Sequence, residues 1–194
     1  MPGIIAFSLS YFCIRFAALG VYYWMPTYLQ EQHNFNKTEA LDIYSWFSTG
    51  SIFGNALLGL ITDLLPIRSP VFEIGIITSA ILMFLQNSLT SYGALSTQNA
   101  LMGATLNGSQ MIIVAIECDI GNYVKKKYDL NALGTFAGVI DGFASIGAII
   151  SQFIIGEMKD KYGWVTLYNI LAVILSISTL PAISFIIFEV KQWR

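Results

Sequence analysis

The stretch that decides the fold is residues 4–29, IIAFSLSYFCIRFAALGVYYWMPTYL, an apolar run in which Arg15 is the one charged side chain. A helix that crosses a bilayer needs about 20 apolar residues, so this run predicts a transmembrane helix. A cation near the bilayer centre costs roughly 2.5–3.5 kcal/mol and usually faces a protein interior or a watery cavity. Arg15 is therefore the first candidate for a functional site.

The composition of the whole chain is that of a membrane protein. Hydrophobic residues make up 55% of the 194 residues and charged residues 11%, and the mean hydropathy is +0.63. Soluble domains carry about 25% charged residues. Six stretches are long enough to cross a bilayer, at approximately residues 4–29, 44–62, 71–91, 97–121, 132–156 and 164–188. We therefore expect an all-α membrane protein, with residues 1–194 forming a single six-helix transmembrane bundle and no soluble domain.

The first stretch is not expected to be a cleaved signal peptide, because Met1-Pro2-Gly3 places no positive charge before it and the apolar run is too long. Cys13 and Cys118 both lie in expected spans and are interpreted as packing residues rather than as a disulfide or metal ligands. The sequence predicts no cofactor, no metal and no nucleic-acid partner.

The distribution of Lys and Arg predicts the orientation of the chain. One side of the expected bundle has Arg68, Lys125, Lys126, Lys127, Lys191 and Arg194, and the other has Lys37, Lys159 and Lys161. The positive-inside rule then places both termini in the cytoplasm. Asn36-Lys37-Thr38 lies in a loop on the opposite side and matches the N-glycosylation pattern, so Asn36 is a candidate acceptor.

Glycines gather in two of the expected spans. They are Gly50, Gly54 and Gly59 in residues 44–62, and Gly134, Gly138, Gly142 and Gly147 in residues 132–156. A spacing of four residues stacks small side chains on one helical face and lets helices approach closely. These faces either pack inside this bundle or dock a second bundle.

Several polar side chains are expected at the middle of the membrane. With a rise of about 1.5 Å per residue from the cytoplasmic helix ends, the depths are about 16 Å for Arg15, about 14 Å for Asp141, about 17 Å for Gln110 and about 21 Å for Asn107. Tyr11 and Tyr22 lie on roughly the same helical face as Arg15. A guanidinium among amides and phenols suits an anion such as phosphate or carboxylate.

Other assignments remain open for the charged residues. Arg15 and Asp141 could instead form a structural ion pair. Glu117 and Asp119 lie nearer the cytoplasmic end of residues 97–121, where water or lysines could meet them, so a structural or gating role is expected for both.

Two further features concern turns and bends. An ion pair between Asp63 and Arg68 is expected to join residues 44–62 to residues 71–91 at a short cytoplasmic turn. Pro26 should bend the first helix near its non-cytoplasmic end, because proline lacks the N–H of the helical ladder. Pro181 could do the same in the last span.

The chain resembles the C-terminal half of a major facilitator superfamily transporter, in the organophosphate:phosphate antiporter branch and most like the eukaryotic sugar-phosphate/phosphate exchangers. The residues that carry the resemblance are Pro2-Gly3-Ile4-Ile5-Ala6-Phe7-Ser8-Leu9, Tyr23-Trp24-Met25-Pro26-Thr27-Tyr28-Leu29, Gly59, Asp63, Arg68, Asn107-Gly108, Ala115, Asp119-Ile120-Gly121, Ile140-Asp141-Gly142, Ser145-Ile146-Gly147-Ala148, Gly156 and Gly163-Trp164.

This resemblance implies that the six spans correspond to family helices seven to twelve, and that an N-terminal six-helix half is missing. It implies antiport of phosphorylated sugars or glycerol phosphate against inorganic phosphate, with the phosphoryl group meeting Arg15. The similar exchangers have Lys at this position, and the bacterial glycerol-3-phosphate transporter has Arg at the position of Ala18, so the charge is kept while its geometry differs. It also implies that the second and fifth spans, with Gly50, Gly54, Gly134, Gly138 and Gly142, pack against the other half. Endoplasmic reticulum is the location it suggests.

The alternatives are a major facilitator transporter of another anionic solute, or a non-transporting membrane scaffold or regulator. An intramembrane serine protease is not expected, because the one histidine, His33, lies in the first loop. ATP-driven transport is not expected either, because the phosphate-binding Gly-x-x-x-x-Gly-Lys-Ser/Thr motif is missing from the sequence.

Overall fold

The computed structural model describes the backbone of residues 2–65, 67–129 and 131–192 and the side chains of residues 4–65, 67–129 and 131–183. Arg194 and the side chain of Lys191, which entered the prediction of orientation, lie outside the described residues. Across the described part of the chain every regular element is a helix, as expected. The helices are α1 (Pro2–His33), α2 (Lys37–Leu64), α3 (Ser69–Leu85), the short η1 (Gln86–Ser88), α4 (Tyr92–Tyr128) and α5 (Leu133–Gln192).

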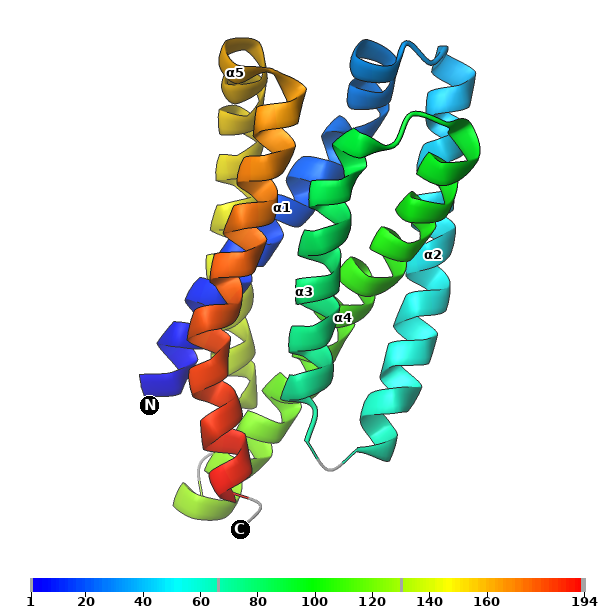
Figure 1. Cartoon of the computed structure of the whole chain (residues 1–194). Coiled ribbons are helices and arrows are strands. Elements are labelled where there is room, and N and C mark those ends of the chain that lie inside the picture. The colour runs from blue at the N-terminus through cyan, green and yellow to red at the C-terminus, as the bar shows by residue number, and fades with distance from the viewer. Residues whose placement is uncertain (1, 66, 130, 193–194) are drawn as a thin grey trace.

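The helix α5 consists of two arms that turn back on each other at Gly163 (Figure 1). Gly163 has φ 77° and ψ 169°, a backbone conformation that glycine adopts without steric cost. Apart from a few terminal residues, each of the six expected spans therefore lies within a helical segment. The helices α1 and α5 continue through Pro26 and Pro181.

Four helical stretches in the described residues are long and apolar enough to cross a membrane: Ile4–His33, Ser69–Ser88, Tyr92–Tyr128 and Leu133–Ile183. The helix α2 is not among them, and the last stretch contains the turn at Gly163. The fold is thus an all-α membrane architecture, and the number of six crossings stays a prediction.

The turns between helices are fixed by local hydrogen bonds. Asn36 caps α2, accepting the backbone N–H of Glu39 at 2.9 Å, while the Glu39 carboxylate accepts the Asn36 backbone N–H at 3.0 Å. This reciprocal arrangement is a capping box. Asp129, with φ 52°, ends α4 and donates its backbone N–H to the carbonyl of Lys125 at 3.0 Å.

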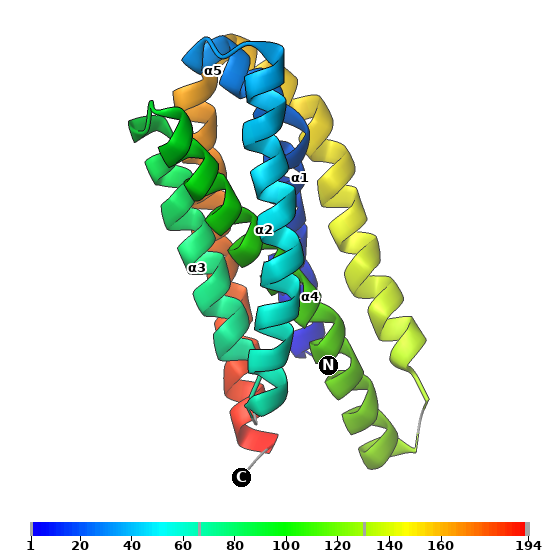
Figure 2. The ribbon, with the colours of Figure 1, turned by 90° about the vertical axis from the view of Figure 1, so that its right-hand side faces the viewer.

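The helices pack in two crossed pairs rather than in chain order. The most extensive contacts are between α1 and α5 and between α2 and α4, and α3 packs against α4 and α5. Figures 1 and 2 show α1 running obliquely between α5 and the rest of the bundle. Because α1 is central, its buried side chains, among them Phe7, Ile14, Met25 and Tyr28, form much of the core.

The two groups of glycines have different surroundings. A Cβ at Gly50 or Gly54 would collide with the backbone of Ala100 or Ala104, so these glycines set the close approach of α2 and α4 inside this bundle. Of the two alternatives that the sequence left open, Gly50 and Gly54 thus follow packing inside this bundle rather than docking of a second one. In contrast, a Cβ at Gly134, Gly138 or Gly142 would meet no atom within 4 Å, so docking of a second bundle there remains a prediction.

Candidate functional site

A cavity of about 470 Å³ lies between α1 and α5. It is lined by Arg15, Leu19, Asp141, Ala144, Ser145, Ala148 and Ile149. The structure thus brings together Arg15 and Asp141, which are distant in sequence and were expected at similar depths. Ser145 is a lining residue that the analysis of the sequence did not select, although it lies four residues after Asp141 and hence on the same helical face.

Arg15 is held in place by a tyrosine one turn earlier on α1. Its Nε donates a hydrogen bond to the Tyr11 hydroxyl at 2.9 Å, and the guanidinium carbon is 5.3 Å from the centre of the Tyr11 ring. A helical side chain leans toward the N-terminal turn, which explains why Arg15 meets Tyr11. Tyr11 is nearly fully buried, so it is poorly placed to contact a ligand. Its hydroxyl instead fixes the position of the Arg15 guanidinium.

Arg15 and Asp141 line the same cavity without pairing. Within the part of the chain that the structure describes, no ion pair within 4.0 Å joins them. A guanidinium has five N–H donors, and Arg15 uses one of them on Tyr11. The arrangement leaves donors that a bound anion could accept from.

Glu117 lies close to this charged site instead of at the water interface. It is 5% exposed, and its Oε1 is buried without a hydrogen-bond partner. Asp141 acts electrostatically on Glu117, and both act on Tyr11. The expectation that interfacial water or lysines would meet Glu117 is therefore wrong. The reason is that Glu117 lies on the buried face of α4, together with Ile113 and Ile120. The local balance is one cation against two carboxyl groups.

The pair predicted at the turn between α2 and α3 is present. Arg68 lies 3.6 Å from Asp63, and its Nε lies 3.4 Å from Asp119 on α4. Arg68 thereby joins the end of α2 and the start of α3 to α4. Because Asp63 and Asp119 are largely exposed, each pair contributes less than about 1 kcal/mol.

Asn107 and Gln110 belong to a separate polar network between α2 and α4. Asn107 donates to the hydroxyl of Ser51 at 2.7 Å, and Gln110 donates to the amide oxygen of Asn107 at 3.2 Å. Neither side chain lines the cavity at Arg15. Ser51 was missed, although its position between Gly50 and Gly54 on a closely packed face was a usable signal.

Tyr22 contacts α2. Its ring centre is 5.5 Å from that of Tyr44, 6.3 Å from that of Phe47 and 5.2 Å from that of Tyr23. Tyr22 is absent from the lining of the cavity, so the structure separates it from Arg15 by about two helical turns. Tyr44 is a further residue that the sequence did not reveal.

The described residues contain no group of three or more His, Cys, Asp or Glu that could hold a metal ion. What the cavity offers is a guanidinium, a carboxyl group, a hydroxyl and small and apolar side chains, in a bundle of membrane helices. Such a site can bind and release a solute.

Comparison with known proteins gives the class to which this architecture belongs. Residues 3–129 match the family described as LacY proton/sugar symporter. The chain belongs to this family and is a LacY-like domain of the major facilitator superfamily. It therefore belongs with transporters and not with enzymes.

The relatives that the chain matches are named as exchangers. The chain is 27% identical over 195 residues to sugar phosphate exchanger 3 of Xenopus laevis, covering 100% of the chain and 39% of the relative. It is 31% identical over 176 residues to sugar phosphate exchanger 3 of Homo sapiens, covering 87% of the chain and 34% of the relative. It is 32% identical over 200 residues to glucose-6-phosphate exchanger SLC37A2 of Mus musculus, covering 100% and 39%. The chain thus spans less than two fifths of the length of these relatives.

Proposed function

We propose that this chain forms part of a secondary antiporter that exchanges phosphorylated sugars or glycerol phosphate for inorganic phosphate by alternating access. The observation that carries the proposal is Arg15, a membrane-embedded cation that lines a cavity with donors to spare. Intramembrane charges of this kind mark substrate pathways. The names of the relatives, sugar phosphate exchanger and glucose-6-phosphate exchanger, supply the chemical class of the solute.

The charges at the site indicate that a second cation is needed. Arg15 shares the cavity with Asp141 and Glu117 lies nearby, so these residues offer one guanidinium against two carboxyl groups. Oppositely placed basic groups would reverse this balance. We propose that a second six-helix half supplies them, as in major facilitator proteins whose halves rock about a midplane site. Gly134, Gly138 and Gly142, whose Cβ positions are open, are the proposed docking face.

The proposed orientation has both termini in the cytoplasm, which places the loop with Asn36 in the lumen or outside the cell. The endoplasmic reticulum is the proposed location. This orientation is supported by the excess of Lys and Arg on one side of the expected bundle, Arg68 and Lys125 to Lys127 among them.

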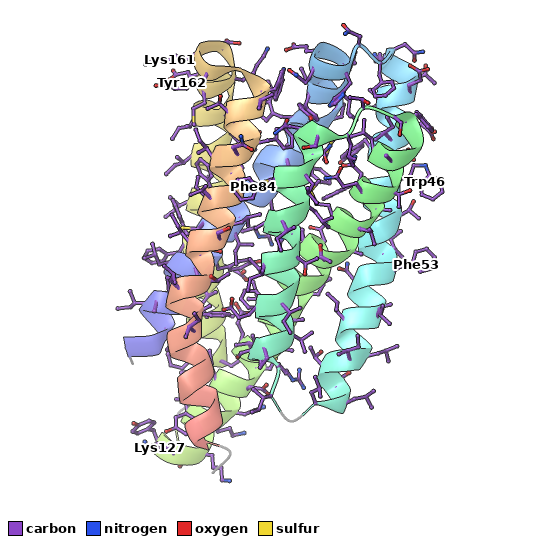
Figure 3. The ribbon with its side chains drawn as sticks, in the orientation of Figure 1. Trp46, Phe53, Phe84, Lys127, Lys161 and Tyr162 are labelled. Atoms are coloured by element: carbon purple, nitrogen blue, oxygen red, sulfur yellow. The ribbon has the colours of Figure 1, made fainter. Side chains whose placement is uncertain are left out.

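The experiment is exchange in proteoliposomes with the longest form of the protein that cells express. Vesicles loaded with labelled phosphate are diluted into phosphate, glucose 6-phosphate or glycerol 3-phosphate. Arg15→Ala removes charge-assisted hydrogen bonds of about 3 kcal/mol in total, so exchange should fall about a hundredfold. Arg15→Lys should keep part of the activity. Lys161→Ala is the control, because this exposed cation, labelled in Figure 3, is absent from the lining of the cavity. Unchanged exchange in Arg15→Ala would remove this residue from the site.

A second candidate function is symport of a proton with a sugar, the activity in the name of the matched family. The unpaired, buried carboxyl of Glu117 beside Asp141 favours it, since such a group can carry a proton. Uptake of an uncharged sugar driven by a pH gradient, without phosphate inside the vesicles, would select this function over exchange. We expect no such uptake. A non-transporting scaffold, or a transporter of another anionic solute, would show neither activity.

A further inference from the structure

The last turn of α4 carries three successive lysines that have no acidic partner. Lys125, Lys126 and Lys127 form this lysine cluster. All three are exposed, and among the described residues no carboxylate lies within 4.0 Å of any of their ammonium groups. In contrast, Lys159 near the turn at Gly163 lies 3.0 Å from Glu31 and 3.4 Å from Asp160. Like charges this close repel one another, so the lysine cluster favours a bound anion.

The length of α4 places the lysine cluster at the level of lipid headgroups. This helix has 37 residues and is about 55 Å long, which exceeds the total bilayer thickness of about 40–45 Å. Figures 1 and 2 show its C-terminal end extending past the turn between α2 and α3. Arg68 of that turn lies 3.4 Å from Asp119, so the cluster lies about 9–12 Å farther along the oblique axis of α4. Headgroups occupy about 5–8 Å on each side of the hydrocarbon core, so flexible lysine side chains at this level reach lipid phosphates.

Two tyrosine rings hold one member of the cluster in place. The Lys127 ammonium is 5.4 Å from the centre of the Tyr123 ring and 5.5 Å from that of the Tyr128 ring. It donates a hydrogen bond to the Tyr123 hydroxyl at 2.9 Å. An ammonium has three N–H donors, so at least one remains for a phosphate oxygen. Tyr128 is 57% exposed, and tyrosine rings favour the membrane interface, where one end is apolar and the other meets headgroups.

The lysine cluster faces the surroundings of the protein and not its interior. Val124, directly before it, is 2% exposed and is the residue of this turn that packs inward. Figure 3 shows Lys127 at the outer end of the bundle. None of the three lysines lines the cavity at Arg15. The adjacent acid is Asp129, which ends α4, so three cations stand against one carboxylate and the local net charge is about +2.

We infer that the lysine cluster, with Tyr123 and Tyr128, binds the phosphate groups of anionic phospholipids. This surface is separate from the cavity at Arg15 and does not depend on the proposed exchange function. A lysine near an anionic membrane surface strengthens binding about fivefold, which is about 1 kcal/mol. With a net charge of about +2, the cluster should prefer an anionic lipid over a zwitterionic one about 25-fold. In the proposed orientation this end meets the cytoplasmic leaflet, which carries anionic lipids.

The test is a lipid titration of the longest expressed form of the protein, purified in detergent. Native mass spectrometry measures the affinities for phosphatidylserine and phosphatidylcholine. Lys127→Gln should weaken phosphatidylserine binding about fivefold, and changing all three lysines to Gln should abolish the preference. Changing all three to Arg keeps the charge and should keep the preference. Lys161→Gln is the matched control, because Lys161 also lies over a tyrosine ring, that of Tyr162 at 5.2 Å, but follows the acidic Asp160. It should change nothing.

Several outcomes would overturn the lipid site. Equal affinities of the unmodified protein for the two lipids would do so, as would an unchanged preference after all three lysines become Gln. Loss of the preference in the Arg variant would show that charge is not its cause. Displacement of phosphatidylserine by millimolar inorganic phosphate at constant ionic strength would show that the cluster binds soluble phosphate instead. Because these lysines are exposed, circular dichroism of each variant should match that of the unmodified protein. Selective lipid binding without phosphate exchange would leave this inference intact and overturn the proposed function.

Discussion

Replacement of Gly54 by alanine tests the packing of α2 on α4 directly. A Cβ at this position would lie 2.6 Å from the backbone carbonyl carbon of Ala104, and closer still to its Cα and oxygen. Carbon atoms pack at about 3.5–4.0 Å, so the helices would have to separate by at least about 0.9 Å. These are backbone atoms, which cannot rotate away as a side chain could.

The separation should be costly for stability and for the polar network. A gap of about this size forfeits a quarter to a half of the dispersion energy across the contact. It would also stretch the hydrogen bond from Asn107 to Ser51, which is 2.7 Å long and lies close to Gly54. Overpacking of this kind lowers the free energy of unfolding by about 1–3 kcal/mol.

The same helix provides the control. A Cβ at Gly59 would meet no atom within 4 Å, and Gly→Ala in an exposed helix raises stability by about 0.5–1 kcal/mol. The two variants should therefore differ by about 2 kcal/mol or more in their free energy of unfolding. Titration with SDS in mixed micelles, followed by circular dichroism, measures this difference. If Gly54→Ala is as stable as Gly59→Ala, the close α2–α4 contact is not as described.

Two further predictions concern the end of the bundle that contains the turn from α1 to α2 and the turn at Gly163. Asn36 uses Oδ1 as the helix cap and leaves Nδ2 available, so in the proposed orientation the protein should carry a glycan that Asn36→Gln removes, seen as a glycosidase-sensitive mobility shift. Absence of that shift in the unmodified protein would count against a luminal loop. Glu31 pairs with Lys159 at 3.0 Å and accepts from Trp164 at 2.9 Å. A double-mutant cycle on the ion pair should give a coupling of about 0.2–1 kcal/mol, and zero coupling would show that the pair does not hold α1 to α5.

The fold class was accessible from the sequence because the bilayer restricts the choices. A chain with so few charges has to satisfy its backbone hydrogen bonds internally, and long apolar runs do so as helices. Hydropathy therefore located the helices, with ends that differ by up to seven residues from those in the structure. It was less informative about α2, whose polar residues make it a weaker candidate for a membrane span than its length suggests. The turn at Gly163 was marked only by a short polar gap.

The candidate site was predicted in part. Arg15 and Asp141 were placed together by their depths, and Tyr11 by its position one turn before Arg15. The same depths grouped Asn107 and Gln110 with them, whereas these amides bond to Ser51 between α2 and α4. Depth gives the position of a residue along the helix axis. The direction in which its side chain points around that axis is known only once the helices that pack against it are known.

The sequence by itself determined that this protein is helical, lies in a membrane and has a cation in its interior. Those properties follow from hydropathy and from the energy of a charge in lipid. Only the tertiary structure decided which faces meet: Gly54 lies against α4, Gly138 stays open, and Tyr22 meets Tyr44. In a membrane protein the lipid-facing and buried sides of a helix are both apolar, so the sequence pattern does not distinguish them. The pairing of α1 with α5 and of α2 with α4 supplies that missing information.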